Sequence, residues 1–121
     1  MDPRHQLGEE GEISAQAWLQ KRRLRVMDRR YRTRYGEIDL IARDGDTWVF
    51  VEVKTRSTAG GYTALDAITP AKCKRLARAA YSYIRHKRLI GQSFRFDFLL
   101  IEAGRVEWIP NAFDIPEYWT L

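Results

Sequence analysis

Three side chains within "GEIDLIARDGDTWVFVEVK" (residues 36–54) have the types and spacing that phosphodiester hydrolysis needs. Asp39 and Glu52 interrupt two otherwise apolar runs, and Lys54 follows Glu52 by two residues. Residues two apart in a strand point to the same face, so Glu52 and Lys54 would project together. Two carboxylates offer the oxygen ligands that Mg²⁺ or Mn²⁺ prefers, and a neighbouring ammonium can orient an attacking water.

The segment that carries these residues is predicted to be a β-hairpin. Residues 36–43 and 47–54 alternate as strands do, and Gly45-Asp46 can form a two-residue turn between them. That turn places Asp39 directly opposite Glu52, on one face of the hairpin, and leaves an apolar face that we expect to form the core. A slip by one residue would bury the acids, so this register is strongly preferred. The apolar face consists of Ile38, Leu40, Ala42, Val49, Val51 and Val53.

A purely structural explanation covers part of this pattern. Glu37 lies opposite Lys54 in the same register, where the two would form a favourable cross-strand ion pair. Asp39 and Glu52 are like charges, and directly opposed like charges destabilise a sheet. A divalent cation between them would remove the repulsion; the alternative is a solvated acidic edge beside an unrelated lysine.

The rest of the chain predicts a small α/β domain over residues 1–121, with a mixed sheet and helices packed on it. Helices are expected at 6–23 and 70–88, the second with Thr69 as N-cap and Pro70 at its first position. Further strands are expected at 24–28, 94–102 and 105–109, and residues 57–63 should form a glycine-containing loop. The aromatic tail 110–121 is expected to pack on the domain.

Basic residues are segregated along the chain, which has a net charge of +5. They gather in "KRRLRVMDRRYRTRYG" (21–36) and "KCKRLARAAYSYIRHKR" (72–88), as a phosphate-binding face requires. A solvated cationic surface is the alternative for each residue. The candidates for phosphate contact are Arg30, Arg32, Arg34, Arg56, Lys72 and Arg75.

Several classes of protein fit the sequence poorly. No apolar run approaches the length of a membrane span, and the first residues lack an apolar signal region. The single cysteine, Cys73, suits a reducing cytoplasm. One cysteine and two histidines also make a zinc site improbable. We therefore expect a cytoplasmic protein without a membrane partner.

The spacing Asp39-x12-Glu52-x-Lys54 on a hairpin resembles the PD-(D/E)xK motif of restriction-endonuclease-like nucleases. A wider pattern, over about residues 8–114, resembles the YraN-like family of small bacterial proteins and, more distantly, archaeal Holliday-junction resolvases. That pattern comprises Gly8-x3-Glu12-x2-Ala15-x3-Leu19, Gly36-Glu37-Ile38-Asp39-Leu40-Ile41, Phe50-Val51-Glu52-Val53-Lys54-x-Arg56, Lys72 and Phe96-Asp97.

The resemblance implies a restriction-endonuclease-like core with a Mg²⁺ or Mn²⁺ site on the hairpin. It implies that Glu12 joins Asp39 and Glu52 as a third carboxylate, and that the Val53 carbonyl completes the ligand set. On its own, Glu12 would be more typical of a solvated acid near a helix end. The expected function is metal-dependent cleavage of DNA, structure-selective or non-specific, with branched recombination intermediates among the candidate substrates.

Two other functions are compatible with the sequence. A nucleic-acid-binding module could keep the fold and the basic segments but cleave little. A protein-interaction domain would rest on "FDIPEYW" (113–119) alone. A homodimer is compatible with the resolvase resemblance, since such enzymes cut two strands symmetrically.

Overall fold

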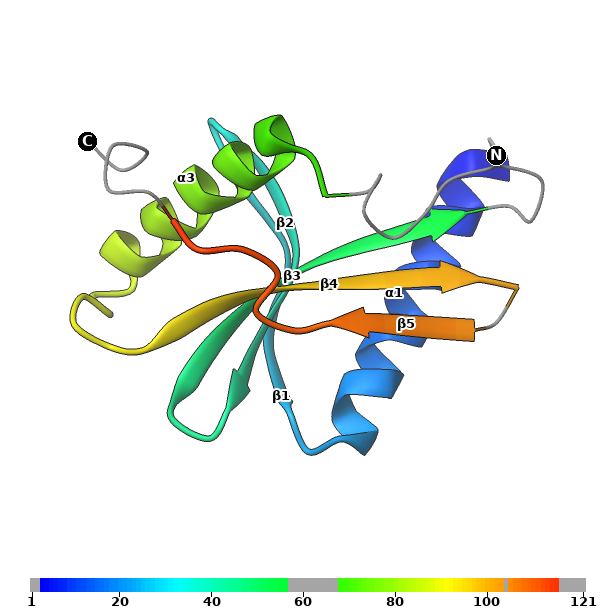
Figure 1. Cartoon of the computed structure of the whole chain (residues 1–121), viewed down its shortest axis with the longest axis horizontal. Coiled ribbons are helices and arrows are strands. Elements are labelled where there is room, and N and C mark those ends of the chain that lie inside the picture. Colours follow the sequence, from blue (N-terminus) through cyan, green and yellow to red (C-terminus); the bar gives the residue numbers. More distant parts are fainter. Residues whose placement is uncertain (1–2, 57–67, 104, 116–121) are drawn as a thin grey trace.

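The protein is an α/β structure built on one five-stranded mixed sheet, as its computed structural model shows for residues 3–56, 68–103 and 105–115 (Figure 1). The strands lie in chain order across the sheet, β1 to β5, and only the pairing of β3 with β4 is parallel. This arrangement agrees with the predicted restriction-endonuclease-like core. The elements are α1 (Pro3–Lys21), β1 (Arg25–Thr33), β2 (Gly36–Asp44), β3 (Thr47–Arg56), α3 (Pro70–His86), β4 (Phe94–Glu102) and β5 (Arg105–Ile109).

The predicted hairpin register is confirmed over the part of β2 and β3 that pairs. Leu40 lies opposite Val51, and the pairing continues to Asp44 and Thr47. Gly45 turns the chain with a φ of +60°, a conformation that glycine adopts without steric penalty. The core positions of the hairpin are therefore set by its turn and its apolar pattern together.

The prediction for β1 was too short. The strand was expected at 24–28, but it continues to Thr33 and pairs with β2 as far as Gly36. The basic stretch is thus part of the sheet rather than a loop that follows it. Because β1 is an edge strand, its charged side chains can reach solvent while its backbone pairs with β2.

The sheet is buried on both faces, which corrects the expected division of the hairpin into one core face and one acidic face. On one face, Ala15 and Leu19 of α1 pack on Leu40 and Val51. On the other face, residues of α3 pack on further apolar side chains of the hairpin. These are Ile41, Trp48 and Phe50, together with Ile38, which was expected on the opposite face.

α3 begins as predicted. The hydroxyl of Thr69 accepts a hydrogen bond from the backbone N–H of Lys72, and Pro70 occupies the first turn. The helix ends at His86, slightly before the predicted residue 88, and Arg88 follows with a φ of +57°. This cap fixes the position of Lys72 at the start of the helix.

Asp97 is the charged residue most deeply enclosed by the described chain, with no exposed surface. The carboxylate accepts hydrogen bonds from Arg95 Nε at 3.1 Å, from Trp108 Nε1 at 3.0 Å and from the backbone N–H of Asn111 at 2.9 Å. Arg95 also donates to Asp44 at 2.9 Å. The network ties β4 to β5 and to the segment after β5, so we assign Asp97 a structural role.

The C-terminal segment lies along the α3 face of the sheet as far as it is described. Phe113 stacks on Phe96 with ring centroids 4.7 Å apart, and Ala112 and Ile115 also pack against that core. Residues 116–121, like the predicted loop 57–63, lie outside the described residues. Within the described part, none of the helices has the length and apolar character to cross a membrane.

Candidate metal centre

The candidate site lies where β2 and β3 stop pairing, a place we call the fork. The pairing between β2 and β3 ends at Leu40 and Val51. Beyond this point each strand is paired only with its other neighbour, β3 with β4 and β2 with β1. In Figure 1 the end of β3 leads away from the tip of the β1–β2 hairpin. The backbone N–H of Val53 donates to Oδ2 of Asp39 at 2.8 Å. The carboxylate of Asp39 thus accepts the hydrogen bond that a backbone carbonyl would accept in a regular ladder. Asp39 and Glu52 are therefore not paired residues of the ladder, as the predicted register would have them.

An irregularity in β2 turns Asp39 toward α1. Ile38 packs in the α3 core with Ile41, although side chains three residues apart in a regular strand point to opposite faces. Leu40, between them, packs in the α1 core. The alternation therefore breaks next to Asp39.

Three carboxylates meet at this break. Glu12 from α1 and Glu37 and Asp39 from β2 each offer an oxygen, and these oxygens lie within 4.8 Å of one another. Glu12 thus lies beside Asp39, where the family resemblance predicted it. Glu37 was expected to pair with Lys54; instead it joins the carboxylates and forms an ion pair with Arg32 at 3.5 Å.

Glu52 contributes a fourth acidic group from β3. Burial and, next, the negative charge of Glu52 raise the pKa of Asp39 to about 7, although the hydrogen bond from Val53 acts to lower it. Burial also raises the pKa of Glu52, while the positive charges of Arg75, Lys72 and Lys54 lower it. Without a cation, the Asp39 carboxyl is therefore mostly protonated below about pH 7 and mostly ionised above it.

α3 supplies positive charge to the same place. Arg75 and Lys72 are the two cations that act most strongly on Glu52, ahead of Lys54. Burial and the nearby charge of Lys54 lower the pKa of Lys72. The aliphatic part of Arg75 lies against Gly36, where a Cβ would come within 2.9 Å of its Cδ. Gly36 also has a φ of +140°, a conformation that other residues rarely adopt. A glycine at this position therefore allows both the backbone conformation and the close approach of Arg75.

The predicted phosphate contacts divide into groups. Arg30 donates to Glu12 at 2.6 Å and Arg32 pairs with Glu37, so both lie beside the acids. Arg34 donates to the hydroxyl of Tyr35 at 2.8 Å, at the hairpin tip. Lys72 and Arg75 belong to the fork itself. Arg56 ends β3, and the position of its side chain lies outside the described part of the chain.

Two features of the site were missed from the sequence. Glu37 was assigned to Lys54 because the hairpin register was extended past the fork. Lys72 was assigned only to phosphate contact, although the capped first turn of α3 places it beside Glu52. The capping pattern Thr69-Pro70 could have indicated that Lys72 lies in the first turn, but not that this turn faces the acids.

Comparison with known proteins connects the site to a family. A family model described as Uncharacterised protein family UPF0102 matches residues 11–101, a range that contains the whole fork. The chain is 44% identical over 114 residues to a UPF0102 protein of Geobacter sulfurreducens, covering 90% of this chain and 89% of that one. A UPF0102 protein of Shewanella woodyi is 44% identical over 118 residues, with 93% and 99% covered. One of Nitrosomonas eutropha is 46% identical over 110 residues, with 88% and 92% covered.

Proposed function

The chain belongs to uncharacterised protein family UPF0102, and from its acidic fork we propose that it is a metal-dependent endonuclease acting on DNA. The observation that carries the proposal is the meeting of Glu12, Glu37 and Asp39 within 4.8 Å, next to Glu52. Carboxylates held this close repel one another, and such an arrangement is stabilised when a cation joins them. The resemblance to PD-(D/E)xK nucleases supports the same reading.

The donors at the fork suit Mg²⁺ or Mn²⁺. All of the gathered side chains are carboxylates, and hard divalent cations take oxygen ligands. Asp39, Glu52 and Glu12 would hold the ion, with the carbonyl of Val53 as a backbone ligand and Glu37 as a further carboxylate. When bound, such an ion polarises a phosphate and lowers the pKa of a water molecule.

The lysines at the fork would act on the attacking water and on the developing charge. Lys54 is exposed and lies two residues after Glu52 on β3, where its ammonium would orient the water. Lys72 is partly buried, and its lowered pKa brings it closer to accepting a proton. The aliphatic part of Arg75 lies against Gly36, and its guanidinium would stabilise negative charge on the phosphate.

The basic residues around the fork would bind the phosphates that flank the cut. Arg32 and Arg34 lie on β1 and the following turn, at the tip beside α3, and Arg78 lies over the ring of Tyr35 at 5.9 Å. Such contacts fix the position of a nucleic acid without reading its sequence. We therefore propose structure-selective or non-specific recognition. Symmetric cutting of two strands would require a homodimer, which light scattering with and without DNA can test.

The test is cleavage of a labelled panel that contains a four-way junction, a flap, a single strand and a linear duplex. Each substrate is incubated with Mg²⁺, Mn²⁺ or EDTA. Glu52→Gln is expected to abolish metal-dependent cutting, because it removes a ligand charge while retaining the shape of the side chain. Glu107→Gln, an exposed change on β5, is the matched control and should cut as the wild type does. Cutting that survives Glu52→Gln, or that proceeds in EDTA, would refute the proposal.

A second candidate function is DNA binding with little cleavage. Arg30 and Arg32 form ion pairs with Glu12 and Glu37, so arginines already neutralise part of the acidic group. In that case the protein should bind DNA equally well in EDTA and Mg²⁺, and no metal should cause cutting. The same panel, read by fluorescence anisotropy, distinguishes the two functions.

A further inference from the structure

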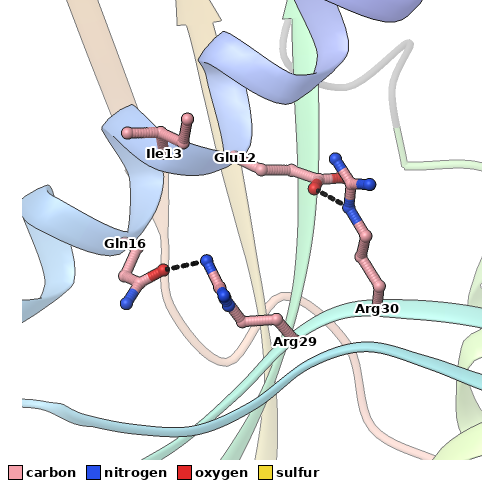
Figure 2. A pocket seen from close by; sticks show the side chains of 5 residues that line it. All are labelled: Glu12, Ile13, Gln16, Arg29 and Arg30. Carbon is pink, nitrogen blue, oxygen red and sulfur yellow. Dashed lines mark hydrogen bonds and ion pairs between the residues drawn. The ribbon is translucent and has the colours of Figure 1, made fainter.

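A cavity lies between α1 and β1, on the side of the acidic site away from α3. Its volume is about 350 Å³, and it is lined by Glu12, Ile13, Gln16, Arg29 and Arg30. Figure 2 shows the first three side chains coming from α1 and the two arginines reaching toward them from β1. Glu12 lines this cavity and is also one of the three carboxylates that meet at the fork, so the cavity adjoins the fork.

The backbone of β1 is built in a way that places two arginines in this cavity. Consecutive residues of a regular strand point to opposite faces. Here both Arg29 and Arg30 reach α1: Arg29 donates to Oε1 of Gln16 at 3.3 Å, and Arg30 donates to Glu12 at 2.6 Å. Arg30 has a φ of +48°, which a non-glycine residue in a strand rarely adopts.

The neighbours of the two arginines confirm the break in alternation. Asp28 accepts a hydrogen bond from the hydroxyl of Tyr83 on the α3 face, and Tyr31 packs edge-on against the same ring. Asp28 and Tyr31 are three residues apart yet share a face, so Arg29 and Arg30 together occupy the other one. Such irregularities re-aim side chains beside functional sites, and this one gives the cavity an extra guanidinium.

The chemistry of the lining fits one nucleotide. Among the described lining residues, two guanidinium groups face one carboxylate, and guanidinium groups are well suited to bind a phosphate. Gln16 offers an amide that can donate to and accept from a base edge. Ile13 is 64% exposed, which leaves an apolar surface on which the flat face of a base can lie. A cavity of this size matches a small ligand and excludes a base pair that is stacked within a duplex.

We propose that this cavity binds one unpaired nucleotide of a DNA strand, adjoining the phosphate that the fork would cut. The inference rests on the proposed nuclease function and narrows its substrate class to DNA with a single-stranded segment. Bases become available to a pocket of this kind when they are free of a duplex stack. The two hydrogen-bonded arginines would exchange their contacts with Gln16 and Glu12 for contacts with the nucleotide.

The test measures binding in EDTA, so that it does not depend on cutting. The probes are a short fluorescein-labelled oligothymidylate and a labelled duplex, and the readout is anisotropy over a range of salt concentrations. Arg29→Gln is expected to weaken binding of the single strand and to make the slope of log K against log salt shallower by about 0.7, the value for one lost phosphate contact. Ile13→Asp is expected to weaken the single strand about tenfold, or ~1.4 kcal/mol, with little change for the duplex.

Matched controls keep the result specific. Arg105→Gln and Ile90→Asp change an exposed arginine and an exposed isoleucine outside the cavity, and they should bind the single strand as the wild type does. Gln16→Glu, which keeps the size of the side chain, provides a third cavity variant if either of the others fails to fold. Equal losses for single strand and duplex, or no loss in any folded cavity variant, would overturn the proposal.

The binding experiment and the cleavage experiment can fail separately, so the two proposals are distinguishable. If the wild type never cuts DNA but the cavity variants selectively lose the single strand, the nuclease proposal fails and the nucleotide site stands. If Glu52→Gln abolishes cutting but the cavity variants bind both probes normally, the nuclease proposal stands and the nucleotide site is refuted.

Discussion

The backbone N–H of Val53 donates to the carboxylate of Asp39 at 2.8 Å, across the gap that opens when β2 and β3 stop pairing. This bond holds an acid between two strands that would otherwise leave backbone groups unpaired. It also brings Asp39 close enough to Glu52 for each to affect the protonation of the other. At the fork, where the pairing of β2 and β3 ends, two neighbouring carboxyl groups therefore have raised pKa values.

Protonation of Asp39 should make stability depend on pH. Its pKa in the folded protein is about 7, against an ordinary 3.8, so the folded state holds this proton more tightly than the unfolded state does. In EDTA, the free energy of unfolding should fall as pH rises from about 4 to about 7, by at most ~4 kcal/mol from this group. Asp39→Asn should remove most of this slope, as measured by urea denaturation at a series of pH values. The raised pKa of Glu52 adds a slope of the same sign.

The control for this experiment is Asp46→Asn, which changes a fully exposed acid in the hairpin turn. Its pH profile should match that of the wild type. A profile for Asp39→Asn that also matches the wild type would contradict the assignment of the proton to the fork.

Metal should reverse the destabilisation that ionised carboxylates cause. Mn²⁺ is expected to raise the midpoint of thermal unfolding, since a ligand at about a hundred times its Kd adds ~2.7 kcal/mol. Affinity should increase between about pH 6 and pH 8, because the metal competes with the proton on Asp39. Differential scanning fluorimetry measures both effects. The shift should be lost in Asp39→Asn and Glu52→Gln and kept in Glu107→Gln; a shift of equal size in all variants would indicate non-specific binding.

Asp97 should contribute to stability rather than to chemistry. Asp97→Ala removes the acceptor for Arg95, Trp108 and the backbone of Asn111, and it leaves a largely buried guanidinium without its main partner. We expect a loss of about 3–5 kcal/mol in the free energy of unfolding. Chemical denaturation measures this change, and Asp114→Ala, at an exposed position, should alter stability by no more than ~0.5 kcal/mol. A stable Asp97→Ala protein that loses only metal binding would contradict the structural role.

Tyr83 offers a test of the contact between α3 and β1. Its hydroxyl donates to Asp28 at 2.7 Å, and burial together with this bond raises its pKa. Tyr83→Phe keeps the ring contacts with Tyr31 and removes the hydrogen bond, which should lower the free energy of unfolding by ~1.5 kcal/mol. Tyr81→Phe, on the exposed side of the same helix, should have little effect. Equal stability of the two variants would show that the bond contributes nothing in solution.

The hairpin and α3 could be predicted from the sequence because their signals are local. Alternating apolar residues around Gly45-Asp46 fix the register, and Thr69-Pro70 marks the start of the helix. The strand from 29 to 33 was missed because its arginines look like a loop, and only pairing with β2 reveals it as a strand. Tertiary contacts decided that element, not propensity.

The candidate site could be predicted in its residue types but not in its geometry. The spacing predicted that Asp39 and Glu52 lie together, and the family resemblance added Glu12. In the structure, Glu12 and Asp39 lie side by side. The positions of Glu37, Ile38 and Arg30 depend on breaks in strand alternation. The alternation of apolar and polar residues along a strand does not indicate where such a break occurs, because the residues before and after the break still alternate.

The single parallel pairing of the sheet has a consequence for the order of folding. β3 can pair with β2 through a tight turn, but Val51 meets Asp97 of β4 only after the intervening chain has crossed over through α3. Closing the longer loop loses more chain entropy, and contacts between distant residues form more slowly. The hairpin that carries Asp39 and Glu52 should therefore assemble before the helix that brings Lys72 and Arg75, so that an ion arriving early would meet the acids before their neutralising partners.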